Sequence, residues 1–400
     1  MALGERLTAA RTRSGLGQDD LAAALGVSRA MVSYWETAKR RPNDRQLTIL
    51  SQLLRTSIAT LEGHEPEPAA PDLAGMILRT LADPPDEARQ GLQDFVSFLD
   101  GYSDLAAAAD YTLHGMKQSP FVSASGYEGA DDARRKAEEV RSHLRLGLGP
   151  IGDMDSVCEL LGVTVYRADL GLDLSKTVSG AFLNHPEVGF SILINLSMTP
   201  GRRRFTQAHE LAHALFHGDD RYLVSTSAKN PRERFADNFA GEFLMPSEGV
   251  RRVMEEHGFG PKIQEPAEVI QLQRFYDVSY ITALVRLRHM RALTAQAFDE
   301  FKNIRPVLFA RALGYEINDE EIHQEPAKWR LERFPPRFRH LIRRAVSTGV
   351  ISVPTAAALT GLPIDELADL VAPSTRAVQA TSEQRAELKQ YEESGVIEYA

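Results

Sequence analysis

The stretch "RFTQAHELAHALFHG", residues 204–218, restricts the fold more than any other part of the chain, because its histidines recur every four residues. On an α-helix, His209 and His213 lie one turn apart on the same face, where two imidazoles can share a zinc ion. Glu210, between them, can then act as general base on a water that the zinc activates. We therefore predict a metal-binding helix with Thr206 as its N-cap and Gly218 just beyond its end.

A catalytic zinc site needs a third protein ligand, and the sequence offers three candidates. His217 is one, but a rigid helix turns it roughly 80° from His209, so it fits better as a helix-end histidine that caps the last carbonyls. Asp219 is an outside candidate at the position that a metzincin pattern would use. The best candidate is Glu233 in "NPRERFADNFAGEFLMP", because it shares a helix face with Asp237. The pair resembles the ExxxD arrangement of thermolysin-like zinc peptidases, which implies that Glu233 ligates the metal and that Asp237 orients a ligating histidine through its free ring N–H.

Composition indicates a globular protein, with 43% hydrophobic and 25% charged residues and no apolar run of membrane-spanning length. The N-terminus lacks the apolar core of a signal peptide. The only cysteine is Cys158, so no disulfide can form within the chain, and we expect a cytoplasmic protein. Residues 1–60 carry a net charge of +4 in a chain of net −9. This imbalance suggests that the front of the chain meets a polyanion.

The basic front end contains "GQDDLAAALGVSRAMVSYWE", which predicts a helix over residues 18–25, a turn at Gly26 and Val27, and a second helix N-capped by Ser28. This stretch resembles the XRE/Cro-type helix-turn-helix family over about sixty residues. The resemblance implies a DNA-binding domain over residues 1–62 that contacts duplex DNA, and many such domains bind as dimers. The residues expected to face base edges are Ser28, Arg29, Ala30, Ser33 and Tyr34; those expected to contact the phosphate backbone are Gln18, Lys39, Arg40 and Arg41. The alternative is a plain helical domain that binds protein.

Further boundaries follow from composition. Residues 63–126 read as a Pro-rich linker and a helical connector, the latter a spacer or a dimer surface. The hydrophobic pattern over residues 127–295 predicts a globular unit with strands at "SGAFLN" and "FSILINL". Residues 296–372 predict a helical C-terminal domain, in which "TAAALTGLPIDEL" echoes "DLAAALGVSRAMV" but carries acidic residues that disfavour DNA. Residues 373–400 read as a polar tail.

Taken with "SILINL" upstream and "FYDVSYITALVRLRHM" downstream, the two metal-site segments resemble the ImmA/IrrE metallopeptidase family over roughly residues 130–292. The resemblance implies an α+β multidomain protein whose mainly helical, zincin-like peptidase domain has a small sheet. It also implies that His209, His213 and Glu233 bind one zinc ion and that Glu210 is the base. Mn²⁺ could replace zinc, because ligand type alone selects weakly. Asp237 departs from the asparagine of many members, although either side chain can accept a histidine N–H.

Members of this family cut a partner repressor and so release phage, mobile-element or stress genes. We therefore expect a helix-turn-helix repressor as the protein substrate, no membrane partner, and a chain that could form a homodimer. The stabiliser of the reaction's oxyanion is not assigned; Tyr222, His217 and Arg204 are candidates by proximity in sequence. The alternative function is a DNA-binding transcription factor whose peptidase-like domain serves as sensor or scaffold. An intact Glu210 favours the peptidase, because a sensor needs no base between two ligands.

Overall fold

The computed structural model describes residues 3–14, 16–54, 84–121, 129–171, 178–218, 221–225, 230–317 and 331–371, with isolated positions between 56 and 77. These residues form two compact units. The larger unit spans residues 65–338, and the smaller unit combines residues 1–64 with residues 339–400. No helix in the described ranges is both long enough and apolar enough to cross a membrane. The expected linker over residues 63–72 and the polar tail from residue 373 lie outside the described residues.

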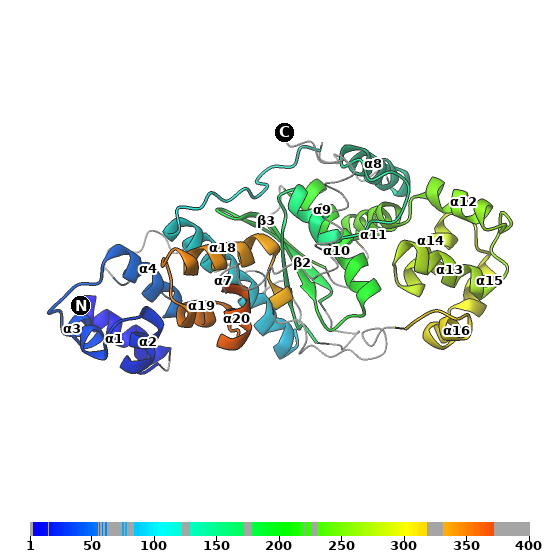
Figure 1. Cartoon of the computed structure of the whole chain (residues 1–400). Helices are drawn as coiled ribbons and strands as arrows, with labels where there is room; N and C mark the ends of the chain where they lie inside the picture. The colour runs from blue at the N-terminus through cyan, green and yellow to red at the C-terminus, as the bar shows by residue number, and fades with distance from the viewer. Residues whose placement is uncertain are drawn as a thin grey trace, which may run out of the picture. The chain divides into compact units, whose positions relative to one another are not determined.

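The larger unit contains all four strands and most of the helices (Figure 1). Its helices before the sheet are α7 (Asp86–Ala108), α8 (Ala130–His143) and α9 (Met154–Leu160). Its strands are β1 (Thr164–Ala168), β2 (Gly180–His185), β3 (Gly189–Asn195) and β4 (Tyr222–Ser225), and helix α10 (Pro200–Phe216) precedes β4. After the sheet come α11 (Pro231–Leu244), α12 (Ser247–Glu256), α13 (Pro266–Tyr276), α14 (Tyr280–His289), α15 (Ala295–Phe301), α16 (Pro306–Ala312) and the short 3₁₀ helix η2 (Leu331–Arg333).

The sheet is mixed, with strand order β1-β3-β2-β4. Strand β1 runs parallel to β3, while β2 is antiparallel to both β3 and β4. The segment "HPEVG" forms the turn between β2 and β3, and the register pairs His185 with Gly189 across it. Strand β4 was not predicted, because its four residues give too short a pattern to separate from a loop.

Both faces of the sheet are covered, which is why every residue of β3 is buried. Alternate side chains such as Val165, Phe182 and Ile192 join the core that includes α10. The residue after Val165, Tyr166, points to the other face and stacks on Phe98 of α7, with ring centroids 4.6 Å apart. A strand buried on both sides reads as a continuous apolar run, as "FSILIN" does.

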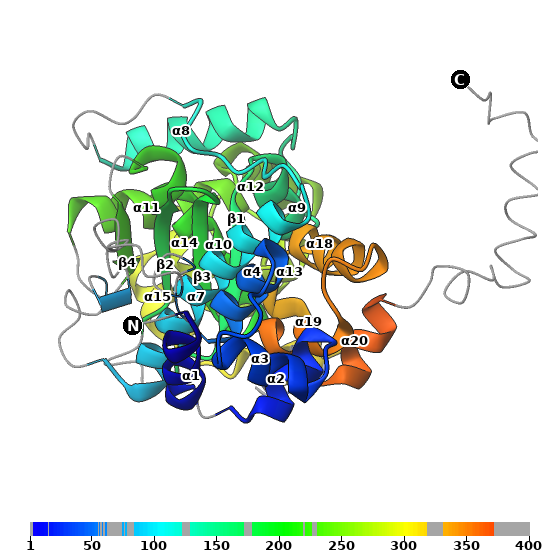
Figure 2. The same cartoon turned by 90° about the vertical axis from the view of Figure 1, so that its left-hand side faces the viewer.

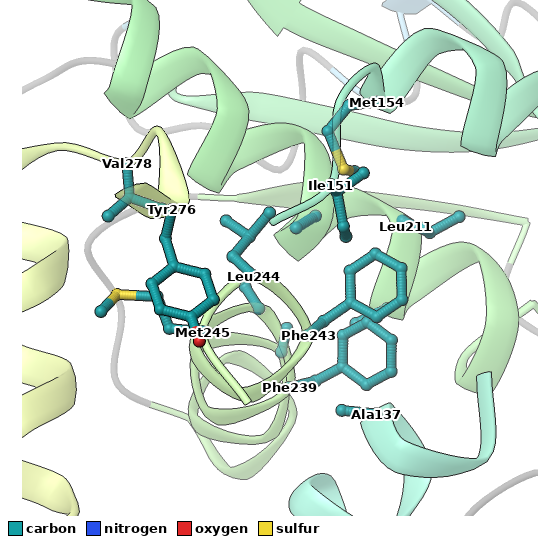
Figure 3. Close-up of a cluster of buried hydrophobic side chains, with 14 of the residues drawn as sticks. Ala137, Ile151, Met154, Leu211, Phe239, Phe243, Leu244, Met245, Tyr276 and Val278 are labelled. Carbon is teal, nitrogen blue, oxygen red and sulfur yellow. The ribbon is translucent and has the colours of Figure 1, made fainter. Parts of the chain in front are cut away.

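Helix α11 packs against α8 and α10 and contributes its buried face to the large core (Figures 1 and 2). Its Phe239 and Phe243 rings stack with centroids 5.3 Å apart. Figure 3 shows these rings together with Leu211 of α10, Tyr276 of α13 and Ala137 of α8. Because α10 and α11 share one tightly packed core, the polar faces they turn to each other are held in fixed positions.

The smaller unit begins with four helices, α1 (Leu3–Arg13), α2 (Gln18–Leu25), α3 (Arg29–Glu36) and α4 (Asp44–Leu53). The predicted helix over residues 18–25 and the predicted Ser28 cap are confirmed: Gly26 ends α2 with φ of 63°, and the Ser28 side chain accepts the Met31 N–H. Val32 and Trp35 of α3 are buried against Leu21 of α2. The helix-turn-helix is therefore held by its own apolar seam.

The same unit contains α19 (Val353–Thr360) and α20 (Ile364–Val371), which form a second helix–turn–helix with Gly361 in the left-handed conformation. Helix α19 packs on α2 and α4. Its Ser352 N-cap donates a hydrogen bond of 2.8 Å to the Ala24 carbonyl, and the buried Thr355 hydroxyl donates to the same oxygen. Arg45 Nε donates to the Val350 carbonyl at 3.0 Å. Carbonyls in the last turn of a helix have no hydrogen-bond partner within that helix. The C-terminal region supplies partners for one of them, the Ala24 carbonyl of α2.

These observations confirm the predicted fold class: a helix-turn-helix, a mainly helical unit with a small sheet, and a helical C-terminal region. The compact units divide the chain differently from the predicted boundaries. Helix α7, which was expected in a connector, packs on β1. Helices α15 and α16 belong to the same compact unit as the sheet, whereas α19 belongs to the unit that contains the helix-turn-helix. Composition marks linkers, but it carries no information on which distant segments pack together. The division falls within helix α18 (Pro336–Ser347).

Candidate metal centre and DNA-facing helix

Helix α10 carries the three histidines, and it begins earlier than the sequence analysis predicted. The N-cap is Thr199, followed by Pro200 at the first helical position, where its fixed φ and missing N–H are tolerated. The prediction that Thr206 caps the helix is therefore wrong: Thr206 is buried mid-helix, and its hydroxyl contacts the Met198 sulfur. The predicted end is correct, because the C-cap is His217 and Gly218 follows it.

The donor atoms of His209, His213 and Glu233 meet in one place. His209 Nε2 lies 3.1 Å from His213 Nε2 and 3.2 Å from one oxygen of Glu233. His213 Nε2 lies 3.4 Å from the other oxygen of that carboxylate. The structure thus places the three side chains that the sequence analysis selected within reach of one point, although 24 residues separate His209 from Glu233.

The spacing of these donors fits a tetrahedral metal ion. Zinc binds imidazole nitrogen and carboxylate oxygen at about 2.0–2.1 Å, so two ligands of a tetrahedron stand about 3.3 Å apart. The two imidazole nitrogens stand 3.1 Å apart, close to that value, and one ligand atom from each of the three residues lies within 4.8 Å of the other two. The donor set of two nitrogens and one oxygen also suits zinc, and three protein ligands leave the fourth position of a tetrahedron open.

Helix α11 fixes the third donor and a supporting carboxylate. Asn230 is the N-cap, and its side chain accepts the backbone N–H of Glu233 at 2.9 Å. Glu233 lies in the first turn, where the helix dipole favours a carboxylate. Asp237 lies one turn further on, and its Oδ1 is 2.9 Å from His209 Nδ1. That contact lets His209 keep its proton on Nδ1 and present Nε2 toward the other donors.

The pKa values of these side chains follow from these contacts. Burial alone would lower the pKa of His209, but hydrogen bonds to Asp237 and Glu233 outweigh it and raise this pKa to about 10. Burial would raise the pKa of Glu233, yet hydrogen bonds from His209 and His213 hold it at about 2. Burial lowers the pKa of His213. A protonated His209 therefore lies between the Asp237 and Glu233 carboxylates, and metal binding at its Nε2 would require the loss of a proton.

Glu210 is fully buried on α10, and its carboxylate lies against strand β2. A Cβ placed on Gly180 would come within 2.5 Å of Glu210 Oε1 and 2.8 Å of the Leu193 carbonyl oxygen. Only glycine at residue 180 therefore leaves room for the carboxylate. The sequence analysis missed Gly180, because "SGAFLN" signals a strand and gives no hint of what the strand faces.

His217 lies on the far side of His213 from the other donors. Its Nδ1 is 2.8 Å from His213 Nδ1, whereas the donors of His209 and Glu233 face His213 Nε2. The ring thus contacts a neighbouring imidazole, which differs from the predicted capping of carbonyls. The other candidate third ligand, Asp219, lies outside the described residues.

Two residues considered for the oxyanion lie on different elements. Arg204 donates to Asp277 Oδ2 at 2.9 Å, and a longer contact of 3.5 Å joins it to the Gly152 carbonyl. Tyr222 begins strand β4, half-buried, opposite Leu183 of β2. Arg204 thus contacts Asp277 and Gly152, neither of which is one of the three donors.

The residues expected to meet DNA lie on and after α3. Arg29, Ala30 and Tyr34 are exposed on this helix, and Ser33 is partly exposed. Arg29 is 3.5 Å from Asp19, with both side chains mostly in solvent.

The residues expected at phosphates differ in how they are held. Lys39, Arg40 and Arg41 are exposed in the segment after α3. Gln18 is partly buried and donates to Glu36 Oε2 at 2.6 Å, in a network that also includes Arg11. Gln18 is therefore engaged within the domain, while the three basic residues remain accessible at its surface.

Comparisons with known proteins match the two segments that contain the candidate sites. Residues 158–288 match the family model of the IrrE N-terminal-like domain, and residues 7–61 match a helix-turn-helix family model. The resemblances drawn from the sequence are thereby confirmed for these two segments.

Two curated relatives extend this comparison. The chain is 36% identical over 108 residues to the radiation response metalloprotease IrrE of Deinococcus deserti, covering 25% of this chain and 37% of that protein. It is 33% identical over 109 residues to the HTH-type transcriptional activator BcrR of Enterococcus faecalis, covering 27% of this chain and 47% of that protein. The chain thus spans less than half the length of these relatives. A solved Mycobacterium tuberculosis transcriptional regulator aligns over 48% of this chain and 51% of that chain at 20% identity, but its TM-score of 0.26 supports no argument.

Proposed function

We propose, from the premise that this chain joins a helix-turn-helix domain to an IrrE N-terminal-like peptidase domain, that it is a regulatory zinc-dependent endopeptidase. The observation that carries the proposal is the meeting of two histidines and a glutamate with donor separations of 3.1 to 3.4 Å. An open site with three protein ligands is the arrangement of catalytic zinc, whereas structural zinc is closed by four. Mn²⁺ could also occupy it, because these ligands discriminate weakly between divalent ions.

The side chains have distinct roles in this proposal. His209, His213 and Glu233 hold the ion, and Asp237 keeps the proton of His209 on Nδ1. A bound divalent cation supplies a Lewis acid that acidifies water and polarises a peptide carbonyl. Glu210 takes the proton of the attacking water and passes it to the leaving amine. Burial of Glu210 beneath strand β2 fixes the direction in which its carboxylate points.

The substrate class follows from the two domains together. A peptidase joined to a DNA-binding domain acts on transcription, and we propose a partner repressor of helix-turn-helix type as its substrate. Cleavage would release phage, mobile-element or stress-response genes, and the name of the relative from Deinococcus deserti, a radiation response metalloprotease, agrees with the last of these. Residues 1–62 would hold the enzyme on duplex DNA in the cytoplasm, either alone or as a homodimer.

The test compares the wild-type chain with Glu210→Gln and His213→Ala. Glutamine is nearly isosteric with glutamate but takes up no proton, so we expect full zinc content and cleavage slower by about 10²–10⁴-fold. His213→Ala should lose zinc. Zinc is measured by elemental analysis, and cleavage by mass spectrometry of a helix-turn-helix repressor encoded beside this gene. Equal zinc in wild type and His213→Ala would contradict the metal site, and full cleavage by Glu210→Gln would contradict the base.

A second candidate is a DNA-binding regulator whose peptidase-like domain serves as a sensor or scaffold. It is favoured by the relative from Enterococcus faecalis, which is named a transcriptional activator. The two candidates differ in what Glu210→Gln does to gene expression. A scaffold would regulate normally with glutamine at residue 210, whereas a peptidase would lose control of its target genes.

A further inference from the structure

We propose that His217 is a positioning residue for the metal centre: its Nδ1 accepts the Nδ1–H of His213 and so holds His213 Nε2 toward the ion. This inference rests on the proposed metal function. It concerns a residue that lies outside the set of three donors and has no role in the chemistry derived above.

The geometry assigns the two edges of the His213 ring to different tasks. His213 Nε2 faces His209 Nε2 at 3.1 Å and the Glu233 carboxylate at 3.4 Å. His213 Nδ1, on the opposite edge, lies 2.8 Å from His217 Nδ1. Both rings are buried, with His213 fully inaccessible to solvent. Water therefore has no access by which it could replace the acceptor at Nδ1.

The chemistry then determines where the protons must be. A neutral imidazole carries one proton, and a metal at Nε2 needs the lone pair there, so the proton of His213 must be on Nδ1. A buried N–H needs an acceptor. His217 can accept at Nδ1 only when its own proton is on Nε2, so the pair has one consistent arrangement. His209 obtains the same support from the Asp237 carboxylate at 2.9 Å.

The backbone and its neighbours hold His217 in this position. It is the C-cap of α10, and its N–H donates to the His213 carbonyl at 2.9 Å, so its side chain follows directly on that of His213. Its ring packs edge-on against Phe235 of α11, with centroids 5.4 Å apart. The next residue, Gly218, closes on β3: a Cβ there would come within 2.5 Å of the Phe190 ring. Two elements thus fix the end of α10.

The competing explanation is that His217 is a packed ring that fills space beside Phe235. Two substitutions separate the explanations. His217→Asn keeps an acceptor, because its Oδ1 occupies the place of the imidazole Nδ1. His217→Leu keeps apolar bulk and removes the acceptor. His257 offers a matched control, because it is also a helix C-cap histidine and its Nδ1 lies 2.9 Å from the Val253 carbonyl oxygen, remote in sequence from the donors.

The experiment measures the zinc dissociation constant of the full-length chain by competition with a chromophoric chelator. We expect His217→Leu to weaken zinc binding about 10–100-fold, the usual effect of losing a residue that supports a ligand. His217→Asn should recover most of that loss, and His257→Leu should bind as wild type does. Thermal unfolding of each metal-free variant reports whether it folds, and His217→Met replaces the leucine variant if that one does not.

The outcomes are distinct for the two claims. A folded His217→Leu that binds zinc as tightly as wild type would overturn the positioning role, as would equal losses in the leucine and asparagine variants. A wild-type chain that binds no zinc would overturn the proposed metal function itself, and the positioning role with it. A third outcome is that wild type binds zinc, His213→Ala does not, and the residue 217 variants bind zinc as tightly as wild type. That outcome would leave the proposed metal function intact and remove only the positioning role of His217.

Discussion

At the scale of single residues, the candidate site depends on a glycine that has no side chain as well as on the side chains of its polar residues. Glu210 lies where a side chain on β2 would otherwise be, and Gly180 supplies the space. The φ of Gly180 is not positive, so the requirement is steric and not conformational. A residue without a side chain thus determines where the proposed base can point.

Gly180→Ala tests this requirement. The added methyl group would lie 2.5 Å from Glu210 Oε1 and 2.8 Å from a backbone oxygen, so either the carboxylate or the strand must move. We expect a loss of about 1–3 kcal/mol in the free energy of unfolding, as for other overpacked cores. We also expect slower cleavage with zinc retained, because the three donors are untouched. Denaturant unfolding, zinc analysis and cleavage of the repressor substrate measure these effects.

Gly101→Ala is the matched control for that change. Gly101 lies in α7, and a Cβ there would meet no heavy atom within 4 Å. Alanine in a helix is favoured over glycine by about 0.5–1 kcal/mol, so this variant should be as stable as wild type or slightly more so. If Gly180→Ala behaved like Gly101→Ala in both stability and cleavage, the steric role of Gly180 would be refuted.

At the scale of elements, two helix pairs set the two candidate sites. Helices α10 and α11 bring His209 together with Glu233 through a shared aromatic core. Helices α2 and α3 pack through an apolar seam that faces inward, and the exposed basic residues Lys39, Arg40 and Arg41 follow α3. In both pairs, the buried face fixes which polar residues are available on the other side.

The DNA-facing pair supports a prediction about two arginines. Arg29 lies at the start of α3, where we expect contacts to base edges, so Arg29→Ala should reduce the preference for the specific site over unrelated DNA. Arg40 lies in the exposed segment after α3, so Arg40→Ala should weaken binding to every duplex and reduce the log–log salt slope by roughly 0.9. Fluorescence anisotropy of the full chain at several salt concentrations, with the promoter of its own gene and a scrambled duplex, measures both.

Opposite behaviour would argue against a DNA reader. Binding that does not change with salt, or equal binding to the promoter and the scrambled duplex, would favour the alternative in which this domain binds protein. Arg11 is not among the residues expected to contact DNA, because its ion pair with Glu36 at 2.6 Å engages it within the domain.

At the scale of the whole chain, the smaller unit is assembled from both ends of the sequence. The carbonyl of Ala24 accepts from Ser352 and Thr355, more than 300 residues later. Thr355 and Ala356 are fully buried in this contact. The helix-turn-helix therefore gains a hydrogen-bond partner and an apolar cover that residues 1–62 do not contain.

Removing both hydroxyls should weaken the smaller unit. In Ser352→Ala/Thr355→Val the Ala24 carbonyl loses its side-chain donors, and an unsatisfied buried acceptor costs about 1–3 kcal/mol. We expect faster hydrogen exchange of the α2 amides and weaker DNA binding, with no change in zinc content. Thr360→Val is the control, because its hydroxyl donates within α19 to the Ala356 carbonyl at 2.8 Å. Exchange rates in the double variant that match those in Thr360→Val would show that the contact adds no stability.

The sequence by itself determined the features that depend on short spacings. The four-residue interval between His209 and His213 requires a helix with both rings on one face, and the same reasoning pairs Glu233 with Asp237. The helix over residues 18–25 and its Gly26 stop follow equally from local rules, because a left-handed C-cap favours glycine. Such features need only the geometry of one element, which a single stretch of sequence contains.

Only the tertiary structure decided the rest. The sequence identified His217 but not the edge of His213 that it faces; it identified the strand of Gly180 but not the carboxylate beneath it. It showed that residues 355–367 resemble the helix-turn-helix, but not that α19 packs on α2. Each of these depends on how elements distant in sequence pack in three dimensions, and local spacing places no constraint on that packing.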